Sequence, residues 1–307
     1  MKTNTEFEEY FQSHIYKATL ILEEKRIKEK GKLKNLLIIA IAFIPLFILG
    51  IFSGHALIIF LCALPFFLLV SYLYKRYVKL VRYLVHNYKK YVLQRAVGFY
   101  FDDFEYIAKQ KIAKVVLDKS RLFPEYIESI YGEDFMRFYM NKVELMFCET
   151  DVYGIKDKKL FRGVFITNSF NKFFNSETFV IARKSATFLQ RIRKQLFSQM
   201  DEVQLENPEF TQKFQTISND QVEARYILTP VMMEHLLDYS KKLGKSISIS
   251  FVKNKMYCSI PISIDLFEPS VFKPIDLDFV KESIAPVLLF TDIVKDLDLN
   301  LRIWSKR

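Results

Sequence analysis

The chain has 307 residues, and 45 Lys and Arg against 35 Asp and Glu leave a formal net charge of +10. Apolar residues make up 50% of the chain, which excludes an intrinsically disordered protein, and 8 Gly with 9 Pro exclude a fibrous one. The three Cys cannot form a disulfide framework and show no metal-ligand spacing.

Residues 1–35 predict an N-terminal cytoplasmic helix. Between residues 3 and 30, apolar side chains recur at steps of three and four with charged residues between them, which is typical of an amphipathic helix. A helix that lies on a membrane surface usually has a basic polar face, whereas this face mixes Glu with Lys. Packing against another segment of the protein is therefore the favoured interpretation.

Residues 36–74 contain no Asp, Glu, Lys or Arg, which makes 39 consecutive uncharged positions. A helix rises about 1.5 Å per residue, so it needs roughly 20 apolar residues to cross a bilayer. We therefore predict two transmembrane helices within this stretch, with a turn at residues 53–55, Ser-Gly-His. A buried soluble hairpin is the alternative, but it would need a polar stripe, and none is visible.

Basic residues flank the uncharged stretch on both sides. Residues 1–35 carry 8 basic and 6 acidic side chains, residues 75–120 carry 11 and 4, and residues 121–307 carry 26 and 25. Lys and Arg beside membrane helices stay in the cytoplasm. We therefore expect a multi-pass membrane protein, with both termini cytoplasmic and the basic flanks against the lipid bilayer. The location of this charge argues against a nucleic-acid partner.

The remaining sequence divides at about residue 120. Residues 75–120 predict a juxtamembrane helical segment, including a helical run at 106–117. Residues 121–307 alternate between strand and helix patterns, which predicts a cytoplasmic α+β domain of short antiparallel strands with packed helices. The expected fold class is therefore α+β, with an N-terminal helix and a transmembrane helical hairpin before this domain.

Local patterns within the α+β domain place some of its elements. Apolar residues alternate on both sides of Lys253-Asn254-Lys255, which predicts a β-hairpin over residues 247–262. The periodicity also predicts helices at 185–199 and about 278–297, and a strand at 299–303.

No motif in the chain indicates catalysis or cofactor binding. The four His share no metal-ligand spacing, and neither a glycine-rich phosphate loop nor a Gly-x-Ser-x-Gly elbow occurs. Cys148 and Cys258 lie in predicted strands and are interpreted as core residues rather than nucleophiles. We therefore expect no catalytic residue, no metal ligand and no cofactor, and a protein that is not an enzyme.

The middle of the α+β domain is unusually aromatic. Phe161, Phe165 and Phe170 belong to a run of Phe between residues 161 and 174. Core packing is the simplest explanation of such a run. The alternative is an apolar groove for a peptide or an acyl chain, which makes these three residues candidate contacts for a ligand or a partner.

Two longer stretches of sequence are distinctive. One joins Leu160-Phe161-Arg162-Gly163-Val164-Phe165 to Ser169-Phe170-Asn171-Lys172-Phe173, and the other runs from Leu205-Glu206-Asn207-Pro208 through Asp220-Gln221-Val222-Glu223-Ala224-Arg225-Tyr226 to Thr229-Pro230 and Met233-Glu234. They resemble the bacterial domain of unknown function family 3137 (DUF 3137), whose members share an N-terminal helix, a membrane hairpin and a cytoplasmic domain. The resemblance to a bacterial family implies that the membrane is the bacterial inner membrane. The family has no assigned activity, so the resemblance implies no catalytic residue.

Arg225 lies in the second of these stretches and is the fourth candidate contact residue. The structural interpretation is an ion pair with Asp220 or Glu223, or a contact with a neighbouring strand. The functional interpretation is a contact with a ligand or a partner.

Two classes of function remain open from the sequence. The first is a membrane-tethered interaction or scaffold module, whose partner is a membrane or cytoplasmic protein or a second copy of the chain. The alternative is a membrane-anchored domain that handles a lipid or a small ligand, with enzymatic activity left open. A channel or transporter is disfavoured, because two helices without charged groups offer no ion path.

Overall fold

The computed structural model describes residues 2–52, 54, 56–123, 125–140, 143–169, 173–183, 200–263 and 265–304. The chain divides into two compact units. The helical unit consists of Met1–Phe99 and Leu266–Ile284, and the sheet unit consists of Tyr100–Asp265 and Ala285–Arg307. This division differs from the four consecutive parts expected from the sequence, because the stretch Leu266–Ile284 returns to the N-terminal helices.

The helical unit is built from two long helices with short helical turns at their far ends. Its elements are α1 (Asn4–Tyr10), a π-helical turn (Phe11–Ile15), α2 (Tyr16–Phe52), α3 (Ala56–Tyr88), a second π-helical turn (Lys89–Leu93) and α4 (Gln94–Tyr100). Thr3 caps α1 in a capping box, in which its hydroxyl accepts from the Glu6 N–H and the Glu6 carboxylate accepts from the Thr3 N–H. The expected N-terminal helix is therefore confirmed.

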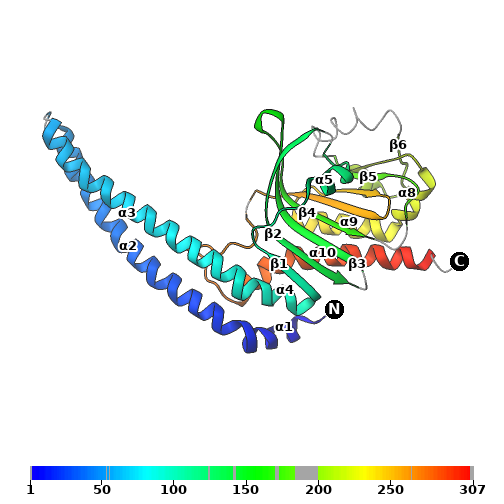
Figure 1. Cartoon of the computed structure of the whole chain (residues 1–307), viewed down its shortest axis with the longest axis horizontal. Helices are drawn as coiled ribbons and strands as arrows, with labels where there is room; N and C mark the ends of the chain where they lie inside the picture. The colour runs from blue at the N-terminus through cyan, green and yellow to red at the C-terminus, as the bar shows by residue number, and fades with distance from the viewer. Residues whose placement is uncertain are drawn as a thin grey trace. The chain divides into compact units, whose positions relative to one another are not determined.

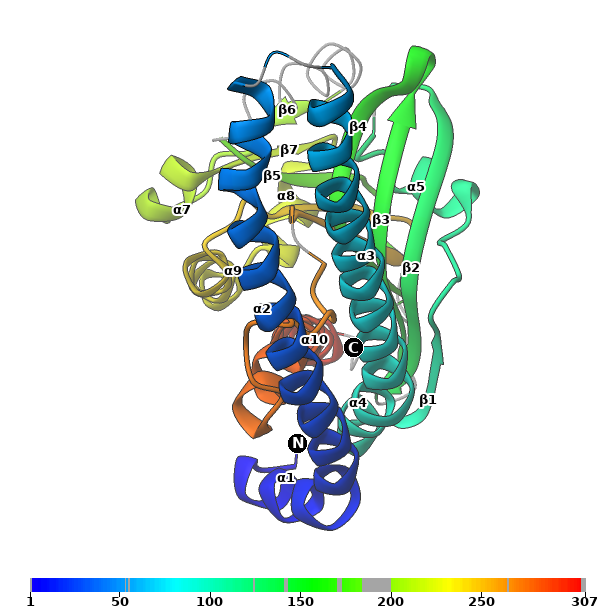
Figure 2. The ribbon, with the colours of Figure 1, turned by 90° about the vertical axis from the view of Figure 1, so that its left-hand side faces the viewer.

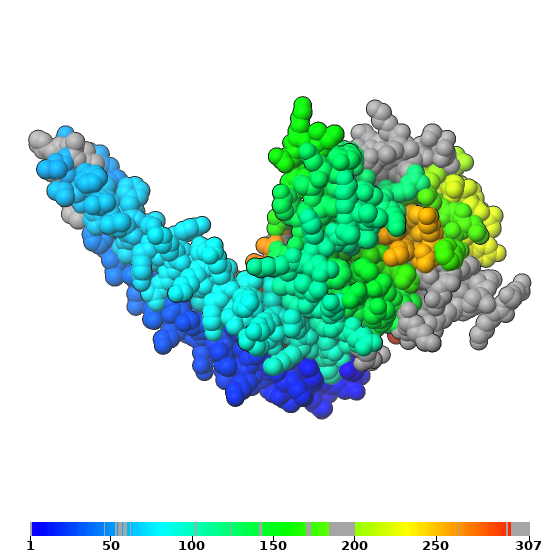
Figure 3. All heavy atoms as spheres, viewed as in Figure 1, coloured from blue at the N-terminus to red at the C-terminus, as the bar shows by residue number. Residues whose placement is uncertain are grey.

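Helices α2 and α3 lie side by side as a hairpin (Figures 1 and 2), and Figure 3 shows their side chains in contact along their length. Buried residues follow one stripe at helical spacing, including Leu22, Arg26 and Glu29 on α2 and Leu80 and Leu84 on α3. Helix α2 ends at Phe52 and α3 begins at Ala56, on either side of the turn predicted at residues 53–55. By length and composition, one helix of the described residues, Asn4–Phe52, qualifies to cross a membrane, a test that core helices of soluble proteins also pass.

The outer surface of the hairpin is apolar over the uncharged stretch. Large apolar side chains that stay exposed there include Leu37, Ile38, Ile39, Ile41, Ile44, Ile48, Leu49, Ile51, Phe52, Leu57, Phe60, Leu61, Leu64, Phe67, Leu68 and Val70. Phe52 is 83% exposed and Leu57 71% exposed. Monomeric soluble proteins rarely expose a continuous apolar surface of this extent.

The sheet unit contains a nine-stranded antiparallel sheet. In spatial order the strands are β1 (Asp102–Ile107), β2 (Ile127–Met140), β3 (Val143–Gly154), β4 (Lys158–Ser169), β9 (Lys255–Pro261), β8 (Ser248–Val252), β5 (Thr178–Ala182), β7 (Phe214–Ser218) and β6 (Asp201–Glu202). A short 3₁₀ turn, Ile155–Asp157, connects β3 to β4. The edge strand β6 has only two residues, and the pairing of the other edge strand, β1, with β2 is interrupted by a bulge; both features disfavour pairing with other chains.

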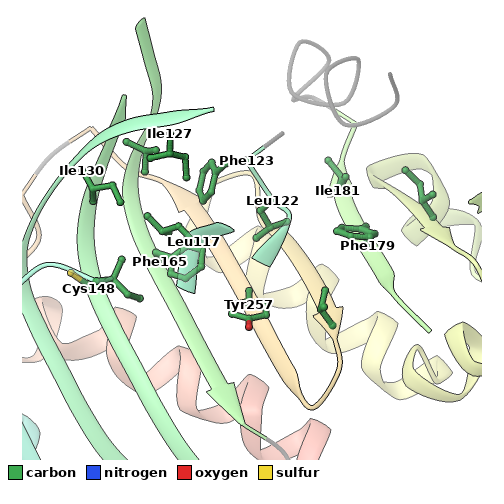
Figure 4. Packing of buried hydrophobic residues seen from close by; sticks show 14 of the residues in the cluster. Leu117, Leu122, Phe123, Ile127, Ile130, Cys148, Phe165, Phe179, Ile181 and Tyr257 are labelled. Carbon is green, nitrogen blue, oxygen red and sulfur yellow. The ribbon is translucent and has the colours of Figure 1, made fainter. Parts of the chain in front are cut away.

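Helices cover the sheet. They are α5 (Lys114–Ser120), α7 (Pro208–Lys213), α8 (Gln221–Ile227), α9 (Pro230–Leu243) and α10 (Leu277–Trp304). On one face, Phe290 of α10 packs edge-on against Phe147 of β3. On the other face, Leu117 of α5 joins a cluster with Leu122, Phe165 and Phe179 (Figure 4). The expected α+β class with antiparallel strands and packed helices is therefore confirmed.

The structure confirms one local prediction and corrects two. The β8–β9 hairpin forms as expected, with Val252 paired to Lys255. The helical run expected at 106–117 is wrong, because the chain first extends β1, paired to β2, and becomes helical only at Lys114. The segment 75–120, which was expected to be helical throughout, is therefore helical only up to Tyr100 and again from Lys114 to Ser120.

The strand expected at 299–303 is also wrong, because α10 continues to Trp304. Extending an existing helix adds one hydrogen bond per residue without a new nucleation cost, whereas a new strand needs a partner. The helix expected at 185–199 lies outside the described residues.

Candidate functional site

A groove opens in the hairpin of the helical unit and has a volume of about 860 Å³. Most of its lining is apolar and comes from α2 and α3, including Leu33, Leu37, Ala40, Ile41, Ile44, Phe66, Val70 and Leu73. Val271 and Phe272 close one side of it. This volume lies within the range of small-molecule binding sites, which are mostly apolar with a few polar groups.

The polar groups of the groove lie at one end. Arg26, Lys30 and Lys34 belong to its lining on α2, and Tyr74 and Tyr77 belong to its lining on α3. On α2 all three cationic lining residues lie at or before Lys34, and every lining residue after Lys34 is apolar, so the groove wall becomes wholly apolar beyond Lys34. The arrangement therefore matches an amphiphilic molecule with an anionic end.

Arg26 is a structural part of the groove wall rather than a free cation. Its Nε donates to Oε2 of Glu23 at 2.8 Å, and its Nη1 donates to the Val271 carbonyl at 2.8 Å. The same Glu23 oxygen accepts from the Ile275 N–H at 2.9 Å. Because the hydrogen bond from Arg26 stabilises the carboxylate, the pKa of Glu23 lies below its usual range. These contacts fix the 271–275 segment against α2.

Lys30 and Lys34 have more freedom. The Lys30 ammonium lies 3.5 Å from the Phe272 carbonyl and 5.9 Å from the centre of the Phe272 ring, and its side chain is exposed. Lys34 is exposed and makes no hydrogen bond or ion pair with another described residue. These two ammonium groups are therefore the cations of the groove that can accept an anionic group.

Outside the lining of the groove, an ion pair joins the two helices. Arg76 of α3 donates from Nη2 to Oε2 of Glu29 at 2.7 Å, and the Glu29 side chain is 12% exposed. The hydrogen bonds from Arg76 lower the pKa of the Glu29 carboxyl and raise the pKa of the Arg76 guanidinium. A pair of this kind fixes the register of one helix on the other.

The aromatic residues predicted from the sequence lie elsewhere, in the sheet unit. Phe165 is fully buried in the core cluster, 6.0 Å from the ring of Phe123. Phe161 packs against the same cluster, 5.4 Å from Phe123. Phe170 lies outside the described residues. The fold therefore brings Phe161 and Phe165 together as packing residues, and their contact with a ligand or partner stays a prediction.

Arg225 lies on α8 and donates from Nε to the Gln204 carbonyl at 3.2 Å. The expected ion pair with Asp220 or Glu223 does not form in the described structure, because both carboxylates have other partners. Asp220 caps α8 by accepting from the N–H groups of Val222 and Glu223. Gln204 lies beyond the end of β6, so this bond is not the expected strand contact either, and a contact of Arg225 with a ligand or a partner stays a prediction.

Glu223, in the same motif, fixes a loop of the sheet unit. Its two carboxylate oxygens accept from the Asn175 N–H at 3.0 Å and from the Ser176 N–H at 2.6 Å. Gln221 donates to the Glu202 carbonyl at 3.1 Å. The polar residues of the distinctive motif thus hold the loops and the β6 edge around α8, which is a structural role.

Two further groups in the sheet unit lack the features of a reactive site. Oxygens of Glu133, Glu149 and Asp265 lie within 4.8 Å of one another, but Arg162 pairs with Asp265 at 2.8 Å. Burial raises the pKa of the Cys148 thiol to about 11, so the thiol rather than the nucleophilic thiolate is present at neutral pH. The interpretation of Cys148 as a core residue therefore agrees with the structure.

Sequence reasoning missed the groove, although a signal for it was present. Lys30, Lys34, Leu37, Ile41 and Ile44 follow one another at steps of four and three, which places them on one face of a helix. The uncharged stretch and its basic flank were read as two separate segments. A continuous helix across their boundary puts both on one surface.

Comparisons with known proteins give one family match. No curated protein matches the chain. A solved structure, the mycobacterial trehalose monomycolate transport factor A (TtfA), is similar at a TM-score of 0.35 and 10% identity, over 62% of this chain and 86% of that one, which is too low to support an argument. The model of the family described as "Protein of unknown function (DUF3137)" matches residues 159–299, which contain both distinctive stretches. Residues 159–299 are therefore similar to the DUF3137 family, whose description assigns no function.

Proposed function

We propose that the protein is a membrane-tethered scaffold, in which the α2–α3 hairpin crosses the bacterial inner membrane twice and holds the sheet unit in the cytoplasm. The observation that carries this proposal is the exposed apolar surface of the hairpin over residues 36–74. Ile38, Leu49 and Leu68 are 56%, 67% and 61% exposed, and each side chain of this size gains about 1.5–3 kcal/mol when it leaves water completely. Hydrocarbon chains of a bilayer provide that environment.

The flanks of the hairpin support a cytoplasmic position for both ends. Lys28 and Lys34 on α2, and Lys75, Lys79 and Arg82 on α3, are exposed, and none of them makes an ion pair with another described residue. Cations of this kind interact with anionic headgroups and resist translocation. The turn at Gly54 lies at the opposite end of both helices and is short enough to emerge alone on the other side.

The scaffold role is supported by the sheet unit. Its sequence is nearly balanced in charge, and on α8 the side chains of Val222 and Tyr226 stand one turn apart, 61% and 53% exposed. Aromatic and apolar side chains of this kind are enriched where proteins bind one another. The proposed partner is a membrane or cytoplasmic protein, or a second copy of the chain.

Fractionation of cells tests the tether. The full chain is expected to stay in the membrane pellet after an alkaline carbonate wash and to enter solution only with detergent. A chain that the carbonate wash releases would be bound at the periphery, which contradicts the proposal.

A photocrosslinker tests the scaffold. Incorporated at Tyr226 in the full chain, it is expected to give one discrete product in membranes, whereas the same group at exposed Glu234 gives none. Equal and diffuse labelling from both positions would remove the scaffold role but leave the tether intact.

A second candidate, the handling of a lipid or small ligand, is favoured by the groove in the hairpin. Its apolar wall and cationic end are the observations that separate it from a simple anchor.

A further inference from the structure

We infer that the groove between α2 and α3 binds one anionic phospholipid, with the phosphate at Lys30 and Lys34 and an acyl chain along Leu37, Ile41 and Ile44. This inference rests on the proposed membrane location of the hairpin. It assigns to the hairpin a specific lipid site in addition to its role as an anchor.

The groove lies where a lipid would meet it. Its lining crosses the boundary between the basic flank and the uncharged stretch, which falls between residues 35 and 36 on α2 and between residues 74 and 75 on α3. Tyr74 and Tyr77 line it at the same level. Tyr side chains are enriched at the headgroup level of membranes, where an apolar ring and a polar hydroxyl are both accommodated.

The length of the groove agrees with the depth of one leaflet. From Lys34 to Ile44 a helix rises about 15 Å, which is half of the roughly 30 Å hydrocarbon thickness of a bilayer. A headgroup at Lys34 would therefore leave an acyl chain alongside apolar wall down to Ile44. Phe66 and Val70 of α3 form the opposite wall of that path.

The charge of the groove selects an anion. The Arg26 guanidinium is already bonded to Glu23 and to the Val271 carbonyl, so it forms part of the groove wall rather than a binding site for an anion. Lys34 has no partner among the described residues, and Lys30 is only weakly engaged by the Phe272 carbonyl at 3.5 Å. Two adjacent ammonium groups on successive turns of one helix repel each other, and a phosphate between them removes that repulsion. A zwitterionic lipid would bring a positively charged headgroup close to these lysines, whereas an anionic lipid brings none and is therefore favoured.

The apolar wall favours a phospholipid over a free phosphate as the ligand. A free phosphate would contact the two lysine ammonium groups but would make no contact with the apolar wall from Leu37 to Ile44. The shared chemistry of both ligands is the phosphate group, and the acyl chain is what distinguishes them.

The test uses the full chain in a nonionic detergent, titrated with phosphatidylglycerol and followed by native mass spectrometry. The arms are phosphatidylglycerol, phosphatidylcholine with the same chains, and inorganic phosphate. We expect one tightly retained phosphatidylglycerol per chain, weaker retention of phosphatidylcholine, and no saturable binding of inorganic phosphate at the same concentration.

Two pairs of matched variants locate the site. The double variant Lys30→Gln/Lys34→Gln is expected to weaken phosphatidylglycerol binding about thirtyfold. The control Lys109→Gln/Lys119→Gln removes the same charge from exposed positions of the sheet unit and is expected to leave binding unchanged. Ile41→Trp fills the groove and is expected to weaken both lipids, whereas Ile38→Trp, at an Ile of nearly equal exposure (56% against 55%) outside the groove, has no effect.

Each contrary result overturns the inference. Equal weakening by the two lysine pairs would indicate general attraction to an anionic surface. Unchanged binding in Ile41→Trp would remove the acyl path, and saturation by inorganic phosphate alone would remove the lipid. If all variants remain in the carbonate-washed membranes, such a failure concerns the lipid site alone, whereas loss of the wild-type chain from that pellet concerns the tether.

Discussion

Arg76 donates from both Nε and Nη2 to the same oxygen, Oε2, of Glu29, at 3.0 and 2.7 Å. The two residues are 47 positions apart in the chain and join α3 to α2 just outside the uncharged stretch. The Tyr72 hydroxyl accepts a further bond from Arg76 at 3.0 Å. A hairpin with apolar faces on both helices can slide in register, and this pair sets one register.

Glu29→Gln is expected to lower the stability of the helical unit by about 1 kcal/mol at neutral pH, because the pair is partly exposed to solvent. The pKa of Glu29 is lowered in the folded chain, so its contribution is present above the ordinary Glu pKa and is lost as the pH falls through the lower, folded value. Thermal unfolding in detergent should therefore show the largest difference between wild type and variant above about pH 5. A difference that stays constant down to pH 3 would contradict this linkage.

Arg26→Gln is expected to release the segment that Arg26 and Glu23 hold. The substitution removes the bonds to Glu23 and to the Val271 carbonyl, so hydrogen exchange should rise about tenfold or more between residues 266 and 276, from the loss of roughly 1.5–3 kcal/mol of charged hydrogen bonding. Lys28→Gln, two residues away on the exposed side, serves as the control. Equal exchange in the two variants would mean that the segment is held by other contacts.

Glu223→Gln is expected to destabilise the sheet unit by about 1.5–3 kcal/mol, because a carboxylate that accepts two backbone N–H groups loses its charge and one acceptor. Chemical unfolding of the full chain in detergent measures the loss. Glu234→Gln changes the same charge on the exposed side of α9, where Glu234 makes no hydrogen bond or ion pair with another described residue, and should stay within about 0.5 kcal/mol of wild type. Equal effects of the two substitutions would assign the loss to net charge.

Much of the fold was predictable from local pattern, and the remainder depends on contacts distant in sequence. The helix ends beside Gly54 follow from the composition of residues 36–74, and the β8–β9 hairpin follows from alternation. The return of Leu266–Ile284 to the helical unit was not predictable, because it rests on contacts such as the one between Arg26 and the Val271 carbonyl, 245 residues apart.

The candidate site was not predictable from residue types either. Phe161 and Phe165 are residue types that often line a ligand groove. In β4, however, the alternation of side chains between the two faces and the contact with Phe123 place them in or against the core. The groove lies instead on residues that look ordinary one by one. It exists because α2 is one unbroken helix from Tyr16 to Phe52, which aligns Lys34 with Ile44.

Gly163→Ala is expected to disrupt the sheet unit. Gly163 has a φ of +154°, and a Cβ there would lie 2.0 Å from the Ile260 carbonyl oxygen of β9, an atom of the backbone that cannot move aside alone. We expect a loss of more than about 3 kcal/mol, or no folded sheet unit, by chemical unfolding. Gly31→Ala, where nothing lies within 4 Å, is the control and should keep wild-type stability or exceed it by up to about 1 kcal/mol. Normal stability of Gly163→Ala would show that β4 and β9 do not approach this closely.

The topology of the hairpin is the most direct test of the account. Alkaline phosphatase, active only in the periplasm, would be inserted after Gly54, and a fluorescent protein that matures only in the cytoplasm would be fused behind Arg307. We expect both reporters to be active in the same full-length chain, which requires two crossings. Fluorescence at Arg307 with an inactive phosphatase at Gly54, or loss of fluorescence at Arg307, would contradict a two-pass anchor and the lipid site that depends on it.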